Sequence, residues 1–179
     1  MRIAILTLIA ASSIAAVPAA LAASSGGPMG GSGDFSAPRE QTPKERARTA
    51  YNEGLRAVRK GDNQAAAAEK ATDERKKDKA AKKSVEFYER ARDSFTLAVQ
   101  NLHSMHEAWN YLGYTRRKLG EYDSALIAYD RALALRPSYP EAIEYRAEAY
   151  LVLNRIEEAK QAYLDLYAGN RKLADQLLV

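Results

Sequence analysis

Few residues in this sequence have the types and the spacing that catalysis or metal binding requires. His103 and His106 are the only two histidines, and Glu107 directly follows the second. Two imidazoles and a carboxylate are groups that zinc accepts, but a turn between helices would fix their geometry only loosely. The sequence contains no glycine-rich phosphate loop, no G-x-S-x-G serine and no carboxylate pair outside ordinary helix surfaces. We therefore expect no catalytic residue, no metal site and no cofactor.

The composition narrows the class of protein further. The chain of 179 residues has no cysteine, which excludes disulfides, thiolate metal ligands and a cysteine nucleophile. Its hydrophobic content of 46% is ordinary for a globular domain, and its length suggests one such domain. The fold must therefore be stabilised by packing alone.

A helical repeat of 34 residues supplies that packing. When the sequence is shifted against itself by this period, four columns of similar residues align at offsets of 0, 3, 7 and 10. The columns are Tyr88, Tyr122 and Ile156; Ala91, Ala125 and Ala159; Phe95, Tyr129 and Tyr163; and Ala98, Ala132 and Leu166. Residues at these offsets share one face of a helix, so each copy presents the same stripe of aromatic and small side chains. We interpret the stripe as core.

The second copy resembles a known family motif. It places Trp109, Leu112 and Gly113 before Ala125, Tyr129, Ala132 and Pro137. This order resembles the tetratricopeptide repeat, W-x2-L-G-x2-Y, A-x3-F, P, although Arg116 replaces the expected aromatic residue. The resemblance covers about 42–173. It implies an all-α fold, a right-handed superhelical solenoid of about three helix hairpins with a C-terminal capping helix.

Five boundaries follow from this repeat and from the flanking composition. We expect a signal peptide at 1–22, a disordered Gly/Ser/Pro-rich linker at 23–41, and a degenerate first hairpin at 42–104 that contains a charged insertion at about 62–86. The second repeat should occupy 105–139, the third 140–169, and the capping helix 170–179. The leucines of this last helix would equally suit a dimerisation surface, so a monomer and a weak homo-oligomer both stay open.

The N-terminal segment has the features of a secretory leader. Arg2 supplies a positive charge, residues 3–17 are apolar, and Ala20-Leu21-Ala22 is a small-x-small cleavage site. We predict cleavage near Ala22 and export to a bacterial periplasm or cell envelope. The alternative is a retained membrane anchor, for which the apolar run is shorter than the roughly 20 residues of a spanning helix.

The first repeat has a clear beginning and a displaced second helix. Thr42, Pro43 and Glu45 predict an N-cap, a first helical residue and a capping box. Gly54 and Gly61 are spaced like Gly113 and Gly120, so we expect the helix to end at Lys60, before Gly61-Asp62. Tyr88 then follows only after an insertion of about 25 residues. This insertion must double back as a solvated arm that no large apolar residue anchors.

The same arm carries most of the chain's net positive charge. Residues 69–83 contain seven basic and four acidic residues. A solvated face is the simpler interpretation, and weak contact with anionic envelope components is the functional alternative. Nucleic acid is not an expected partner, because no aromatic residues stand between the lysines to stack on bases.

The resemblance also implies where a partner would bind. In proteins similar to this repeat, the first helix of each hairpin lines a concave groove that binds a peptide or protein segment. By helix face, the corresponding residues here are Tyr51, Asn52 and Leu55; Glu107, Asn110, Tyr111, Tyr114 and Arg117; and Glu141, Glu144, Tyr145, Glu148 and Leu151. Tyrosines beside acidic residues suit a segment with apolar and basic side chains. The Lys and Asn clamp that grips a C-terminal carboxylate in some members looks absent.

Overall fold

The computed structural model describes residues 39–176, and every regular element in that part of the chain is an α-helix. The helices are α1 (Pro43–Lys70), α2 (Glu74–Asn101), α3 (His106–Lys118), α4 (Tyr122–Leu135), α5 (Pro140–Val152), α6 (Ile156–Gly169) and α7 (Arg171–Gln176). The all-α prediction is confirmed. The predicted signal peptide, residues 23–38 of the predicted linker, and Leu177 and Leu178 lie outside the described residues.

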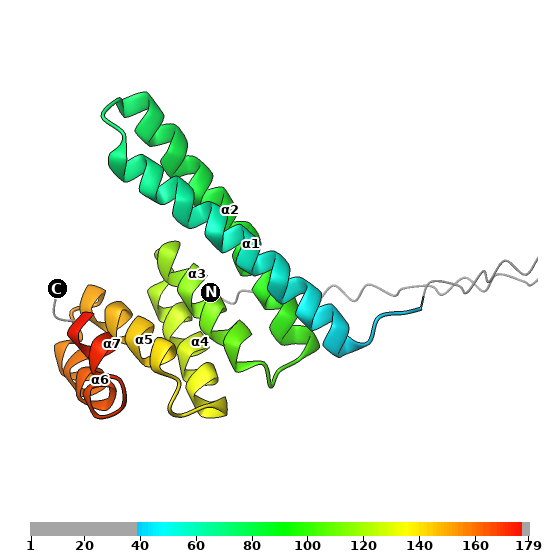
Figure 1. The fold of residues 1–179 in the computed structure, drawn as a ribbon, viewed down its shortest axis with the longest axis vertical. Helices are drawn as coiled ribbons and strands as arrows, with labels where there is room; N and C mark the ends of the chain where they lie inside the picture. Colours follow the sequence, from blue (N-terminus) through cyan, green and yellow to red (C-terminus); the bar gives the residue numbers. More distant parts are fainter. Residues whose placement is uncertain (1–38, 177–179) are drawn as a thin grey trace, which may run out of the picture. The chain divides into compact units, whose positions relative to one another are not determined.

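Successive helices pair into hairpins that stack in chain order. α1 packs on α2, α3 on α4 and α5 on α6, while the α2–α3 and α4–α5 contacts join each hairpin to the next (Figure 1). α3 also contacts α5, which brings the first helices of two hairpins together. α7 packs on both α5 and α6, and Ala174 on α7 is fully buried in their shared cluster.

The aligned columns form the interior of the hairpins, as their spacing predicted. Phe95 and Tyr129 are fully buried in equivalent positions of α2 and α4. The alanine column is buried in all three repeats. Ile156 departs from its column, since it is 40% exposed at the first residue of α6. A residue in the first turn of a helix lies at the edge of the hairpin, where the partner helix no longer covers it.

Two glycines explain how closely the paired helices approach. A Cβ atom added to Gly54 would lie 2.6 Å from the Phe95 ring, and one added to Gly113 would lie 2.5 Å from the Tyr129 ring. Both contacts are shorter than carbon atoms tolerate, so only glycine lets each aromatic ring lie flat against the facing helix. Because Phe95 and Tyr129 are one period apart, the first hairpin repeats the second at this point.

The turns within the second and third hairpins share one backbone conformation. Gly120 has φ 78° and Asn154 has φ 57°, both in the left-handed region. Glycine adopts it without strain and asparagine tolerates it, which is why Asn replaces Gly one period later.

The first hairpin does not turn at the position that glycine spacing predicted. α1 continues through Gly61 to Lys70, so the expected stop at Gly61-Asp62 is wrong. Gly61 is buried, and a Cβ there would lie 2.8 Å from the Tyr88 ring. Gly61 is therefore, after Gly54, the second glycine of α1 at a close contact with α2. The actual turn lies at residues 71–73.

The inserted residues lengthen both helices of this hairpin. Their contact surface is small, with Ala80 and Ser84 buried on α2 and alanines 65, 66 and 68 partly buried on α1. Alanine keeps a strong helix propensity and lets the two helices pack without large side chains. The chain does double back, and Figure 1 shows the far end of the hairpin standing clear of α3 to α7.

The start of α1 is the one predicted. The Glu45 amide donates to the Thr42 hydroxyl at 3.2 Å, and the Thr42 amide donates to the Glu45 carboxylate at 2.7 Å. Pro43 is the first helical residue. The capping box is confirmed. Hydrogen bonding of the Glu45 carboxylate to the Thr42 amide, and then to the Thr42 side chain, lowers the pKa of Glu45.

Candidate tyrosine groove

Four tyrosines from three different helices form a continuous row. Tyr51 of α1 lies 5.9 Å from Tyr111 of α3, measured between ring centroids. Tyr111 lies 6.4 Å from Tyr114, and Tyr114 lies 5.3 Å from Tyr145 of α5. The first helix of each hairpin therefore contributes to one aromatic surface, which we call the tyrosine groove.

A hollow of about 390 Å³ lies along this groove. Tyr111, Tyr114 and Tyr145 line one part of it. The lining is completed from α1 by Leu55, Val58, Arg59 and Asp62. Arg59 is exposed at the rim and Val58 is buried, so the hollow has an apolar floor with charged groups above it.

Asp62 joins three helices at one end of the hollow. Its Oδ1 atom accepts hydrogen bonds from the Tyr88 hydroxyl of α2 and from the Tyr114 hydroxyl of α3, each at 2.7 Å. Burial, followed by these bonds to the carboxylate, raises the pKa of both tyrosines. Both hydroxyls stay protonated, and so they remain donors that hold Asp62 in place.

Arg117 sits against the same aromatic row. Its guanidinium lies 2.6 Å from the Glu148 carboxylate and within 5.6 Å of the centroids of the Tyr114 and Tyr145 rings. Burial acts to lower the pKa of Arg117, but Tyr129 and Glu148 outweigh it, so its pKa is raised. Arg117 is thus a fixed cation whose charge Glu148 balances.

Two carboxylates of α5, those of Glu144 and Glu141, lack such a partner among the described residues. Glu144 is 8% exposed and forms no ion pair or hydrogen bond among the described residues. Burial, then the charges of Glu148 and Glu141, raise its pKa. Glu141 is exposed one turn away, and Glu107 on α3 faces His106 at 3.2 Å. α5 therefore presents more negative charge than Arg117 alone can balance.

The structure brings most of the thirteen predicted groove residues to one side of the hairpins, but not all to an open surface. Asn110 is 1% exposed and Glu144 is 8% exposed, so the expectation that helix phase exposes them is wrong. Asn52 is exposed and Leu151 is 43% exposed, and neither lines the hollow. Neighbouring helices in the stack bury positions that a single helix would leave open.

Asp62, Val58 and Arg59 are groove residues that sequence reasoning missed. All three lie on α1 near the expected stop, where Gly61-Asp62 was interpreted as a turn. A better signal was available, because Leu55, Val58 and Asp62 recur at spacings of three and four residues, as one face of a continuing helix does.

The two histidines do not converge on a site. The His103 carbonyl accepts a hydrogen bond from the Trp109 indole at 2.8 Å, whereas the His106 ring packs edge-on against Tyr139. Between residues 39 and 176, no three His, Cys, Asp or Glu residues lie close enough together to hold a metal ion. In the same part of the chain, no helix is both long enough and apolar enough to cross a membrane.

Known structures share this arrangement of helices. The first TPR domain of Spaghetti (RPAP3), bound to the HSP90 peptide SRMEEVD, matches with a TM-score of 0.58 and 18% identity, over 76% of this chain and 90% of that one. The TPR2B domain of yeast Sti1 in its complex with pHsp70 matches with a TM-score of 0.54 and 16% identity, over 74% of this chain and 92% of that one. At these identities the likeness concerns the fold.

A third similar structure is the CopN–Scc3 complex, with a TM-score of 0.55, 20% identity and coverage of 74% of this chain and 66% of that one. No curated protein sequence matches the chain. The tetratricopeptide repeat family matches residues 106–139, which span α3, α4 and the turn that follows. Residues 106–139 therefore match the tetratricopeptide repeat family, and the array of hairpins in which they lie has the fold of tetratricopeptide domains.

Proposed function

We propose that this protein is a non-catalytic scaffold that binds a peptide or protein segment in the tyrosine groove. The row of Tyr51, Tyr111, Tyr114 and Tyr145 across three helices is the observation that carries the proposal. Large, rigid aromatic side chains supply contact area at little entropic cost, and their hydroxyls supply polar contacts. The similar tetratricopeptide structures that contain HSP90 or Hsp70 peptides support the same class of function.

The charges of the groove favour a ligand with basic and apolar side chains. Glu141 and Glu144 have no ion pair among the described residues, while Arg117 is already balanced by Glu148. A lysine or arginine of the ligand would supply the missing positive charge, and its aliphatic neighbours would pack on the tyrosine rings.

The place of action is part of the same proposal. The leader-like sequence of residues 1–22 supports export, and we place the scaffold in a bacterial periplasm or cell envelope. Expression with and without residues 1–22, followed by fractionation and N-terminal sequencing, tests this. A mature chain that begins at Ala23 in the periplasmic fraction is expected, and an uncleaved chain in the cytoplasm would refute it.

A peptide array tests the groove. Immobilised peptides of random sequence should retain the protein best where basic and apolar residues alternate. Glu107→Lys/Glu141→Lys should remove or invert that preference, because it reverses charges at the rim. The matched control is Glu89→Lys/Glu157→Lys, which makes the same number of charge reversals at exposed positions of α2 and α6 away from the groove. An unchanged preference in Glu107→Lys/Glu141→Lys would show that binding does not use the groove.

Alanine substitution of the tyrosines is a weaker test than charge reversal. Tyr111 stacks on Phe95 with centroids 5.4 Å apart, and Tyr114 holds Asp62. Removing these side chains would lower the stability of the fold as well as the contact area. A loss of binding in Tyr111→Ala/Tyr114→Ala therefore supports the groove only if the variant melts at the same temperature as the unchanged protein.

The first hairpin favours a second candidate, contact with anionic envelope components. Four basic side chains and two acidic ones lie together on the surface of α2, namely Arg75, Lys79, Lys82 and Lys83 with Asp78 and Glu86. None of the four basic side chains forms an ion pair among the described residues, so positive charge is in excess there. Binding to vesicles that contain phosphatidylglycerol should then weaken steeply with salt and disappear in Lys79→Gln/Lys82→Gln/Lys83→Gln. Salt-independent binding, or none at all, would exclude this role.

A further inference from the structure

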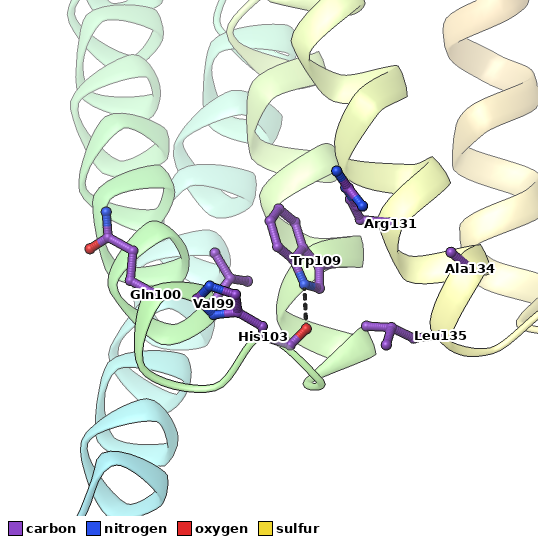
Figure 2. Close-up of a pocket in the computed structure, with 7 residues that line it drawn as sticks. All are labelled: Val99, Gln100, His103, Trp109, Arg131, Ala134 and Leu135. Carbon is purple, nitrogen blue, oxygen red and sulfur yellow. Dashed lines mark hydrogen bonds between the residues drawn. The ribbon is translucent and has the colours of Figure 1, made fainter.

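A second hollow of about 480 Å³ lies between α2 and α4, on the side of α3 that carries Trp109 (Figure 2). Trp109 and Tyr111 are two residues apart on α3 and therefore project from nearly opposite faces of the helix. Trp109 lines this hollow, whereas Tyr111 lines the tyrosine groove. The two sites are separate, and no part of the proposed peptide groove accounts for the second one.

Apolar side chains form most of its wall. Val99 of α2 is 4% exposed at its base, Trp109 stands between the flanking helices, and Leu135 at the end of α4 is 45% exposed. The indole Nε1 donates to the His103 carbonyl at 2.8 Å, which fixes the ring as one wall of the hollow. The exposed rim shows that the hollow opens to solvent.

Arg131 is the one arginine or lysine side chain that lines this hollow. It is exposed, and it forms no ion pair or hydrogen bond between residues 39 and 176. The neighbouring Asp130 is engaged by Arg146 at 2.8 Å, and no carboxylate lines the hollow. An occupant that combines an apolar body with a negative charge would match this lining.

The apolar surface continues beyond the hollow along both helices. Leu97 lies about one turn before Gln100 on α2 and is 50% exposed, and Ile127 lies one turn before Arg131 on α4 and is 60% exposed. Residues spaced by three or four positions share a helix face. The strip is therefore longer than a single small molecule requires, and it suits a polypeptide that presents apolar side chains at successive turns.

We propose that the Trp109 hollow is a second protein-binding site, which takes a helical segment carrying aliphatic side chains and one acidic residue. The aliphatic side chains lie on Trp109, Leu135 and the adjoining strip, and the carboxylate pairs with Arg131. The protein would then bind one partner in the tyrosine groove and another on the opposite side of α3.

Trp109 is the only tryptophan of the chain, so its fluorescence reports this hollow alone. The probe is a capped, tryptophan-free Ala/Gln helix with leucines on one face and a glutamate one turn from the last leucine. Two matched peptides replace that glutamate by glutamine or by lysine. We expect the glutamate peptide to shift Trp109 emission saturably, and the other two to bind roughly ten-fold more weakly or not at all.

Two arginine variants test the pairing without altering the packing. Arg131→Gln should weaken the binding of the glutamate peptide to the level seen with the glutamine peptide. Arg56→Gln removes the same charge at an exposed position of α1 and should leave the binding of the glutamate peptide unchanged. Equal titration by all three peptides, or full binding to Arg131→Gln, would overturn the proposal.

Two other occupants are tested in the same experiment. Octanoate combines an apolar chain and a carboxylate without a polypeptide. If octanoate binds more tightly than the glutamate peptide and displaces it completely, the ligand of this hollow is a small lipid acid and the proposal of a protein ligand is overturned. An emission shift that depends on protein concentration alone would assign the site to a second copy of this chain, and would equally overturn the proposal.

Discussion

At the scale of single residues, the closest contacts of the hairpins depend on the absence of a side chain. Gly113 lies under the fully buried Tyr129, as Gly54 lies under Phe95. Gly113→Ala should lower the free energy of unfolding by about 1–3 kcal/mol, because the new methyl group overlaps the Tyr129 ring. Urea denaturation followed by circular dichroism measures the change. Gly169→Ala is the control, since a Cβ there meets nothing within 4 Å.

Also at the scale of single residues, the raised pKa of Glu144 predicts that the stability of the fold depends on pH. Its folded-state pKa is raised, so the folded protein binds this proton more tightly than the unfolded chain does. Glu144 therefore costs stability once pH rises above its ordinary value of 4.5 and through the folded value. Glu144→Gln should raise the melting temperature at pH 7, and the gain should shrink as pH falls toward 4.5. A gain independent of pH would contradict the burial of the charge.

At the scale of elements, Asp62 of α1 couples the first hairpin to the second through Tyr114, and it joins α1 to α2 through Tyr88. Asp62→Ala and Tyr114→Phe should each destabilise the protein by about 1–3 kcal/mol, since Tyr114→Phe breaks one part-buried hydrogen bond and Asp62→Ala breaks that bond and the one from Tyr88. The double variant should cost clearly less than the sum, because both changes remove the same bond. Additive costs would show that the two residues act independently. Asp93→Ala, in an exposed ion pair with Arg92, provides the matched control.

The first hairpin also shows what sequence could and could not predict. The column of Phe95 and Tyr129 and the capping box at Thr42 are set by local chemistry, and both were predicted correctly. The prediction that the helix stops at Gly61 was wrong because a turn and a close contact between helices both favour glycine. Only the position of Tyr88 on the facing helix distinguishes the two cases. The predicted exposure of Asn110 and Glu144 was wrong for a similar reason. The periodicity of a single helix does not indicate which of its faces neighbouring helices will bury.

At the scale of the molecule, packing is unequal along the chain. The cluster around Phe95 and Leu112 draws on α1 to α4, whereas the cluster around Leu166 is smaller and serves α5 to α7. In repeat arrays, each hairpin is stabilised mainly by its neighbours. Hydrogen exchange should therefore be fastest in α6 and α7 and slowest in α2 and α3. Leu166→Ala should speed exchange in α5 to α7 while leaving α1 and α2 unchanged, and a uniform effect would indicate a single cooperative unit.

The long first hairpin has a further consequence for how partners meet this protein. An excess of basic over acidic side chains lies on α2 near its far end, and carboxylates without an ion pair lie on α5. Separated charges of opposite sign give the folded domain an electric dipole, which turns it as it diffuses toward a charged surface. Salt would then slow the rate at which complexes form far more than the rate at which they separate. The hairpin would set the speed of recognition, while the grooves would set how long a complex lasts.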